Sequence, residues 1–241
     1  MYEINTRVRY SQVQSDLKVN MATVANYFQD CALFHSESIG KTLEVVEASN
    51  RAWFLSGWQI EVKRYPKFNE KITIRTWPHG FKGMYGYRNF DILDQEGNAI
   101  VIANSIWIFM DLNAVRPAKA TEEDIAGYEI EEPIPMDYAP RKIQVFDDMF
   151  QFGDVPEPIS VKKSFLDSNH HVNNVRYVTE AMDLLPDLNI KSMRVDYRKA
   201  ATMGEILYPK RLQKEDTYQV IFSDDKGSPY VILELLSSPL I

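Results

Sequence analysis

Apolar and polar residues alternate over two groups of short stretches in this chain of 241 residues. Such alternation is typical of strands that bury one face. The first group comprises residues 57–64, 71–77, 85–93 and 99–110. The second group comprises residues 191–199, 204–208, 216–223 and 230–237. Turn residues at 94–97 and 223–227 predict that the last two strands of each group form a hairpin.

A helix is predicted before each group of strands, over residues 22–38 and 173–185. Both helices begin after the dipeptide Val-Asn, and each dipeptide follows an aspartate, Asp16 or Asp167. This order indicates two copies of one module, of which the first has lost its chemistry, because Lys18 stands where the second has a histidine. Few helices and many strands, without alternating βα units, predict the α+β class.

Acidic residues and prolines are concentrated between the two halves. Neither a helical nor a strand period persists from residue 121 to residue 158. We therefore expect an N-terminal module over residues 1–130, a linker over residues 131–158 and a C-terminal module over residues 159–241.

Asp167, Asn169 and His171 form the candidate catalytic site. At alternate positions of an extended segment, these side chains would project the same way and bring a carboxylate, an amide and an imidazole together. They would supply a general base, an orienting group and a side chain that titrates near neutral pH, which suits acyl hydrolysis. The alternative interpretation is the capped start of a helix with solvated polar residues.

The stretch that holds these residues, Asp-Ser-Asn-His-His-Val-Asn-Asn-Val-Arg-Tyr at 167–177, resembles the D-x-N-x-H-V-N-N-x-x-Y signature of the acyl-carrier-protein thioesterases. Two upstream stretches are similar to the same family. Residues 64–70, followed by Thr76-Trp77, match its R-Y-P-x-aromatic-x-acidic segment, and residues 103–110 match its A-x-S-x-W-x-x-M strand. The three blocks keep the family's order over about residues 60 to 200.

The resemblance implies a tandem (double) hotdog fold, in which each module wraps a curved antiparallel sheet around one long helix. It also implies hydrolysis of fatty acyl-acyl carrier protein to a free fatty acid. In that family, the residues matching Asn169 and His171 polarise the thioester carbonyl, and carboxylates such as Asp167 activate water. Hotdog relatives place the acyl chain in the first module, so the region from Ala25 to Phe54 is expected to gauge its length.

One position departs from the family pattern. After Tyr-Arg-Lys the family carries a further catalytic glutamate, where this chain has Ala200. Asp167 is then the expected general base, unless Glu205 or Glu180 folds into the site. An acyl-CoA thioesterase with the same chemistry, or a protein that binds acyl groups without hydrolysing them, is the alternative function.

Composition limits the partners. A formal net charge of −7 argues against nucleic acid, so an acidic carrier protein would have to dock on a local basic patch. No apolar run reaches the roughly 18 residues that span a bilayer and no secretory signal is recognised, so we expect a cytoplasmic protein without a membrane partner. Cys31, the single cysteine, is expected in the core. Four histidines without ligand spacing predict no metal or cofactor, and the sheet edges allow a homodimer.

Overall fold

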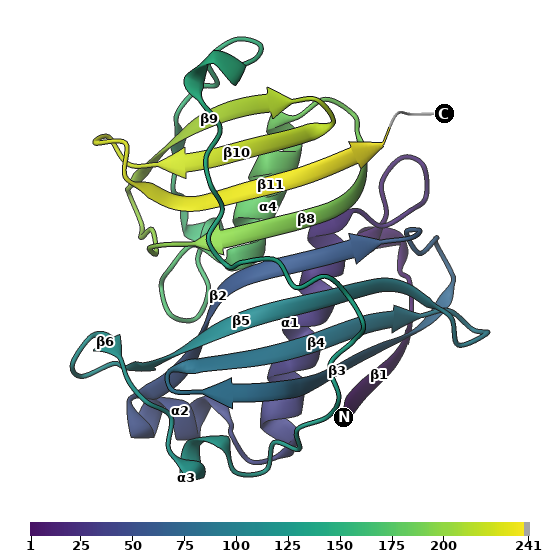
Figure 1. The fold of residues 1–241 in the computed structure, drawn as a ribbon, viewed down its shortest axis with the longest axis vertical. Coiled ribbons are helices and arrows are strands. Elements are labelled where there is room, and N and C mark those ends of the chain that lie inside the picture. Colours follow the sequence, from purple (N-terminus) through teal and green to yellow (C-terminus); the bar gives the residue numbers. More distant parts are fainter. Residues whose placement is uncertain (239–241) are drawn as a thin grey trace. The chain divides into compact units, whose positions relative to one another are not determined.

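The computed structural model describes residues 1–238, which form two compact units (Figure 1). Unit 1 comprises Met1–Ser56 and Ile60–Tyr138, and unit 2 comprises Gly57–Gln59 with the chain from Ala139 onward. The division after Tyr138 lies inside the predicted linker. The module boundaries given above stay a prediction.

Unit 1 contains a sheet with the strand order β1-β3-β4-β5-β2, and β6 pairs with β5. The ladders from β1 through β3 and β4 to β5 are antiparallel, which confirms the predicted hairpin of residues 85–93 with 99–110. The strands are β1 (Tyr2–Arg7), β2 (Arg51–Val62), β3 (Lys71–Lys82), β4 (Tyr85–Leu93), β5 (Ala99–Asp111) and β6 (Arg116–Pro117). The helices are α1 (Met21–Ser38), α2 (Leu43–Ser49) and α3 (Glu122–Ile125), with a 3-10 turn at Tyr10–Gln12.

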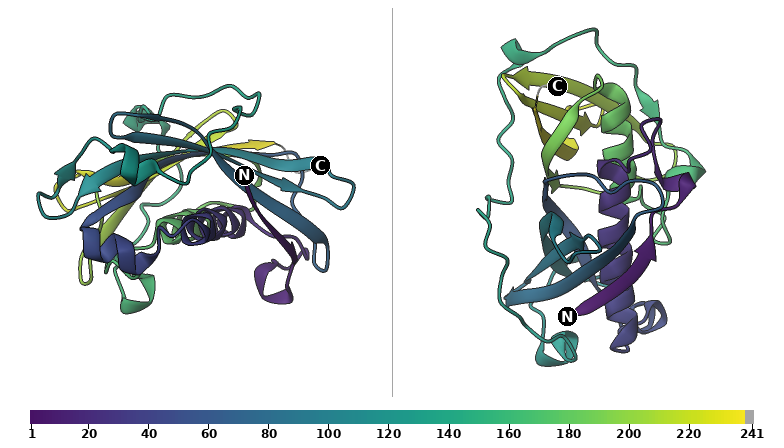
Figure 2. Two further views of the ribbon diagram at one scale, coloured as in Figure 1. Left: turned by 90° about the horizontal axis from the view of Figure 1, so that it is seen from below. Right: turned by 90° about the vertical axis from the view of Figure 1, so that its right-hand side faces the viewer.

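Helix α1 lies against one face of the unit 1 sheet (Figure 2). The ring of Phe28 on α1 packs on that of Phe90 on β4, with 5.0 Å between centroids. Cys31 is fully buried, its thiol donates to the carbonyl of Ile74 at 3.6 Å, and burial raises its pKa to about 12. Cys31 is therefore a core residue, as predicted.

Unit 2 contains a sheet with the strand order β8-β11-β10-β9-β7, packed against helix α4. Its strands are β7 (Ile159–Ser160), β8 (Asn189–Tyr197), β9 (Ile206–Lys214), β10 (Thr217–Ser223) and β11 (Pro229–Ser238). Its helices are α4 (Asn174–Leu184) and the 3-10 turns Asp148–Phe150 and Lys163–Phe165. Each unit thus combines an antiparallel sheet with one principal helix, and the predicted α+β tandem hotdog fold is confirmed.

Both principal helices are entered through the same kind of turn. We call residues 14–20 and 167–173 the helix-entry turns of units 1 and 2. In unit 2, the N–H of Asp167 donates to the carbonyl of His171 at 2.8 Å, and His170 has a left-handed φ of 60°.

The helix-entry turn of unit 1 repeats this geometry. The N–H of Gln14 donates to the carbonyl of Lys18 at 2.8 Å, and Leu17 also has a φ of 60°. Asn20 and Asn173 then cap the two helices, because their side-chain oxygens accept the N–H groups of residues 23 and 175 at 2.9 and 2.8 Å. The predicted internal repeat is confirmed.

One strand was predicted with wrong bounds, and several local elements were not predicted. Residues 10–20 form a 3-10 turn followed by the helix-entry turn. The strand predicted at 204–208 runs from Ile206 to Lys214, because sheet pairing continues past Pro209 where the apolar alternation weakens. Strand β1 and helix α2 were not predicted. Among the described residues, no helix combines the length and apolar character needed to cross a bilayer.

Candidate active site

The three predicted catalytic residues lie in the helix-entry turn of unit 2. The segment is not extended, because the N–H of Asp167 bonds to the carbonyl of His171 at 2.8 Å and that of His170 bonds to the carbonyl of Asp167 at 3.1 Å. Asp167 and His171 are half-buried at the base of this turn, and Asn169 is exposed at its tip. The three residues therefore share one hydrogen-bonded turn, and not one face of an extended segment as alternation had predicted.

The carboxylate of Asp167 also bonds to the turn. Its Oδ1 accepts the N–H of Asn169 at 2.8 Å and that of His171 at 3.3 Å. Its Oδ2 has no hydrogen-bond partner among the described residues. One oxygen of Asp167 therefore organises the turn, and the other can accept a proton from water.

The chain that follows β8 supports the turn. The N–H of Val172 donates to the carbonyl of Ala201 at 2.9 Å, and His171 forms an antiparallel bridge with Thr202. Ala200 is exposed beside this contact. The position at which the resembled family has a glutamate is therefore next to the turn but carries only a methyl group.

Glu205, the first candidate to replace that glutamate, braces the same piece of chain. Its carboxylate accepts the N–H and the hydroxyl of Thr202 at 2.6 and 3.0 Å and the hydroxyl of Tyr230 at 2.6 Å. Burial acts to raise the pKa of Glu205, but the hydrogen bonds from Tyr230 and Thr202 outweigh it and hold this pKa below its ordinary value. Glu205 is thus a turn residue, and it holds the chain that pairs with His171.

Glu180, the second candidate, forms an ion pair with Arg176 one helical turn earlier on α4. The guanidinium of Arg176 lies over the ring of Phe165, 3.9 Å from its centroid. The carboxylate of Glu205 is thus engaged with Thr202 and Tyr230, and that of Glu180 with Arg176. Asp167 is the candidate carboxylate that lies in the helix-entry turn itself.

Buried Tyr177 and half-buried Tyr197 lie close to the start of α4, and sequence reasoning assigned a role to neither. The hydroxyl of Tyr197 donates to the carbonyl of Asn174 at 2.9 Å, and the ring of Tyr177 packs against Tyr197 and Phe222. Burial raises the pKa of both tyrosines, so both hydroxyls stay protonated. Tyr197 opens the Tyr-Arg-Lys motif, but its contact with α4 is made only through the folded sheet.

The remaining candidate histidines belong to unit 1. His35 Nδ1 lies 2.9 Å from Arg88 Nη1, and His79 Nε2 lies 2.9 Å from Asn104 Oδ1. Burial, followed by the charge of Arg88, lowers the pKa of His35 to about 4, so its imidazole is neutral near pH 7. No group of three or more histidine, cysteine or acidic side chains within residues 1–238 is arranged to hold a metal ion.

The sequence matches two family models. The model described as the acyl-ACP thioesterase N-terminal domain matches residues 1–128, and the one described as the acyl-ACP thioesterase C-terminal domain matches residues 154–228.

Curated relatives carry related names. The chain is 26% identical to the chloroplastic palmitoyl-acyl carrier protein thioesterase of Arabidopsis thaliana over 226 residues. The aligned region covers 86% of this chain and 54% of that protein. It is 27% identical over 221 residues to the chloroplastic dodecanoyl-[acyl-carrier-protein] hydrolase of Cinnamomum camphora, with 83% and 56% covered. The chain spans about half the length of the curated relatives it matches.

Two solved structures share the fold along nearly the whole chain. An acyl-ACP thioesterase from Bacteroides thetaiotaomicron gives a TM-score of 0.88 at 24% identity, over 98% of this chain and 97% of that one. The 12:0-ACP thioesterase from Umbellularia californica gives 0.87 at 21% identity, over 99% and 97%.

Proposed function

This chain belongs to the acyl-ACP thioesterase family, and from that premise we propose that it hydrolyses the thioester of fatty acyl-acyl carrier protein and releases the free fatty acid. The substrate class is taken from the names of the curated relatives. The chemistry is assigned to the helix-entry turn of unit 2.

In the proposed reaction, Asp167 takes a proton from water as the water oxygen attacks the thioester carbon. Asn169 and His171 donate hydrogen bonds to the carbonyl oxygen, where negative charge develops. The positive end of the α4 helix dipole favours the same charge. The carbon–sulfur bond then breaks, and the leaving sulfur takes up the proton that Asp167 removed from water, passed through His171, which restores the Asp167 carboxylate.

The comparison of the two helix-entry turns carries this proposal. Unit 1 closes the same turn with Gln14 and Lys18 at the places of Asp167 and His171. The backbone therefore does not need an aspartate and a histidine at these places in order to fold. Asp167 also stabilises its turn through Oδ1, so the proposed chemical role rests on its Oδ2 and on the imidazole of His171.

The thiol that carries the acyl group, coenzyme A or acyl carrier protein, has to be decided by experiment. Coenzyme A and carrier protein present the same thioester to the turn, so the same residues would serve an acyl-CoA thioesterase.

Exposed Ala200 favours the other alternative, a protein that binds acyl groups without hydrolysing them, because the neighbouring carboxylates Glu205 and Glu180 are engaged.

Three further assignments accompany the proposal. The region from Ala25 to Phe54, which covers most of α1 and the start of β2, gauges the acyl chain. The protein acts in the cytoplasm, unlike relatives named as chloroplastic. It can also form a homodimer through sheet edges, which sedimentation analysis tests directly.

The deciding experiment measures thiol release from medium-chain and long-chain acyl carrier protein esters beside the matching CoA esters. We expect turnover of the carrier esters, with a preference among chain lengths. Turnover of CoA esters alone would replace the proposed substrate, and acyl binding without turnover of either would overturn hydrolysis.

A pair of variants ties the activity to the turn. His171→Ala is expected to abolish turnover, because it removes a donor to the carbonyl oxygen. His170→Asn is the matched control: His170 is exposed on the same turn, and asparagine tolerates its left-handed φ of 60°. Equal loss in both variants would mean that the turn, and not the imidazole of His171, was damaged.

A further inference from the structure

Unit 1 exposes three large apolar side chains on two neighbouring loops. Tyr10 is 75% exposed, Leu17 is 49% exposed and Phe68 is 44% exposed. Tyr10 and Phe68 touch edge to face, with 5.9 Å between ring centroids. We call these three residues, together with Lys18 and Lys67, the basic aromatic surface.

The two loops are bonded into one rigid platform. The N–H of Phe68 donates to the carbonyl of Leu17 at 2.7 Å, and Lys18 forms an antiparallel bridge with Lys67. Leu17 adopts a left-handed φ of 60°, which costs a branched residue about 1 kcal/mol. The turn requires this φ, as it does at His170 in unit 2, so the cost comes from the choice of leucine, which the turn holds exposed.

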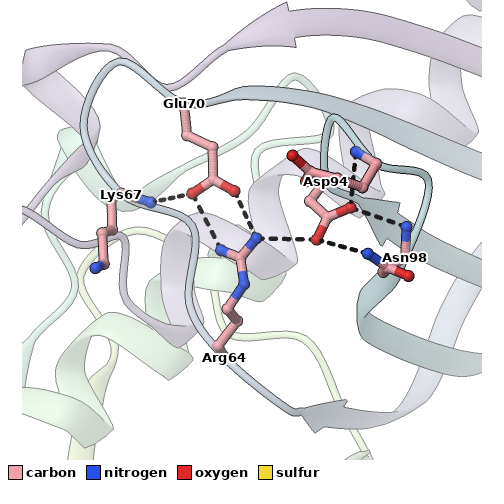
Figure 3. Close-up of polar contacts among 6 residues, drawn as sticks. Arg64, Lys67, Glu70, Asp94 and Asn98 are labelled. Carbon is pink, nitrogen blue, oxygen red and sulfur yellow. Dashed lines mark hydrogen bonds and ion pairs between the residues drawn. The ribbon is translucent and has the colours of Figure 1, made fainter.

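A charged network joins the loop that carries Lys67 and Phe68 to the β4–β5 hairpin (Figure 3). Arg64 donates to both oxygens of Glu70 at 3.1 and 2.8 Å and to Asp94 at 3.2 Å. Glu70 in turn accepts the N–H of Lys67 at 2.9 Å. Asp94 accepts the N–H of Asn98 at 2.8 Å in the β4–β5 hairpin. The motif at 64–70, which the proposed reaction does not use, thus serves to present this loop.

The charge on these loops is opposite to that of the protein. Residues 7–20 and 63–71 carry seven cationic and two acidic side chains, a net charge of +5 on a chain whose formal net charge is −7. Of the two acids, Glu70 is bound to Arg64, and Asp16 pairs with Lys18 at 3.3 Å. All seven cations are exposed, and six of them lie outside the Arg64 network: Arg7, Arg9, Lys18, Lys63, Lys67 and Lys71.

We propose that the basic aromatic surface of unit 1 binds the face of an anionic lipid bilayer. Aromatic and aliphatic groups at loop tips enter the interfacial layer, and neighbouring lysines meet the lipid phosphates. A bilayer fits because exposed aromatic and aliphatic side chains, with Tyr10 and Phe68 in contact, stand at loop tips among exposed lysines and arginines. This departs from the expectation of no membrane partner, which rested only on the lack of a spanning segment.

The test is co-sedimentation of the full chain with phosphatidylglycerol vesicles and, in parallel, with phosphatidylcholine vesicles. We expect binding to the anionic vesicles that falls with added salt, because surface attraction is screened. Each cation near an anionic surface strengthens binding about fivefold, so Lys18→Glu with Lys67→Glu should weaken it at least about 25-fold. Lys119→Glu, an exposed site elsewhere in unit 1, is the matched control.

A second pair separates binding from folding. Leu17→Asn with Phe68→Ser removes two apolar tips and should weaken vesicle binding, while asparagine relieves the left-handed strain, so the melting temperature should not fall. No vesicle binding, or equal binding by all variants, would overturn the proposal. A dimer that forms without lipid and that this pair dissolves would assign the surface to a second copy instead.

A protein partner is the remaining competitor. If the lysine pair lowers turnover of carrier-bound esters but leaves vesicle binding intact, the surface docks an acidic protein and the proposal is wrong. Vesicle binding needs no turnover, so its outcome is independent of the proposed hydrolysis.

Discussion

Replacing Asp167 with asparagine separates the two contributions of its carboxylate. Oδ1 accepts the N–H groups of Asn169 and His171 at 2.8 and 3.3 Å, and Oδ2 is the proposed proton acceptor. An asparagine side chain keeps one carbonyl oxygen for the backbone bonds but cannot act as a base near neutral pH. Alanine at the same position removes both functions.

The structure sets the size of each effect. A positioned general base contributes about 10²- to 10⁴-fold to rate, so Asp167→Asn should lower kcat by that factor. The two backbone bonds are worth about 1 kcal/mol each at a partly exposed site, so Asp167→Ala should also cost about 1–2 kcal/mol of unfolding free energy. The asparagine oxygen can still accept the N–H groups of Asn169 and His171, so the asparagine variant should fold with nearly the stability of the parent.

The assay combines thiol release from acyl carrier protein esters with urea unfolding of the same preparations. Asp16→Asn is the matched control, because Asp16 accepts the N–H of Lys18 at 3.0 Å in the unit 1 turn and takes no part in the proposed chemistry. If Asp167→Asn kept the full rate while Asp167→Ala lost stability, the aspartate would be structural and the base assignment would be refuted.

Three other substitutions test separate parts of the structure. Ala200→Glu places a carboxylate beside the helix-entry turn and should raise kcat about tenfold or more, and an unchanged rate would show that this position does not reach the substrate. The pKa of His35 falls from 6.5 to about 4 on folding, so stability is full above pH 6.5 and declines by up to about 3 kcal/mol as pH falls to 4. Urea unfolding at several pH values should show this slope, and His35→Gln should lack it. Asp196 is fully buried and accepts hydrogen bonds from Arg141 and Arg198 at 2.8 and 3.0 Å, so Asp196→Ala should destabilise unit 2 by about 3–5 kcal/mol, seen as a lower urea midpoint than that of Asp187→Ala on the surface.

Local signals located the elements whose causes are local. Helices α1 and α4 begin where Asn20 and Asn173 cap them, and both caps depend on residues two or three positions away. Strand β4 coincides with the predicted stretch 85–93, because the turn that follows it at residues 94–97 is specified by local residues. Strand β1 escaped prediction, since its pairing with β3 depends on residues about seventy positions later.

The sequence by itself determined which chemical groups the candidate site contains and that two copies of one module are present. It also recorded the loss of a carboxylate at Ala200. Only the tertiary structure decided how these groups are used. Alternation placed Asp167, Asn169 and His171 on a strand, whereas hydrogen bonds across the turn fold them together.

Long-range contacts decided the rest of the site. From the sequence, Glu205 could be either a catalytic carboxylate or a turn residue. The hydroxyl of Tyr230, 25 positions later, donates to its carboxylate at 2.6 Å, and this contact exists only in the folded sheet. His171 is held by its bridge to Thr202, which lies in the segment between β8 and β9. Such partners are set by the register of the sheet, and register depends on packing between strands far apart in the chain, which no local pattern encodes.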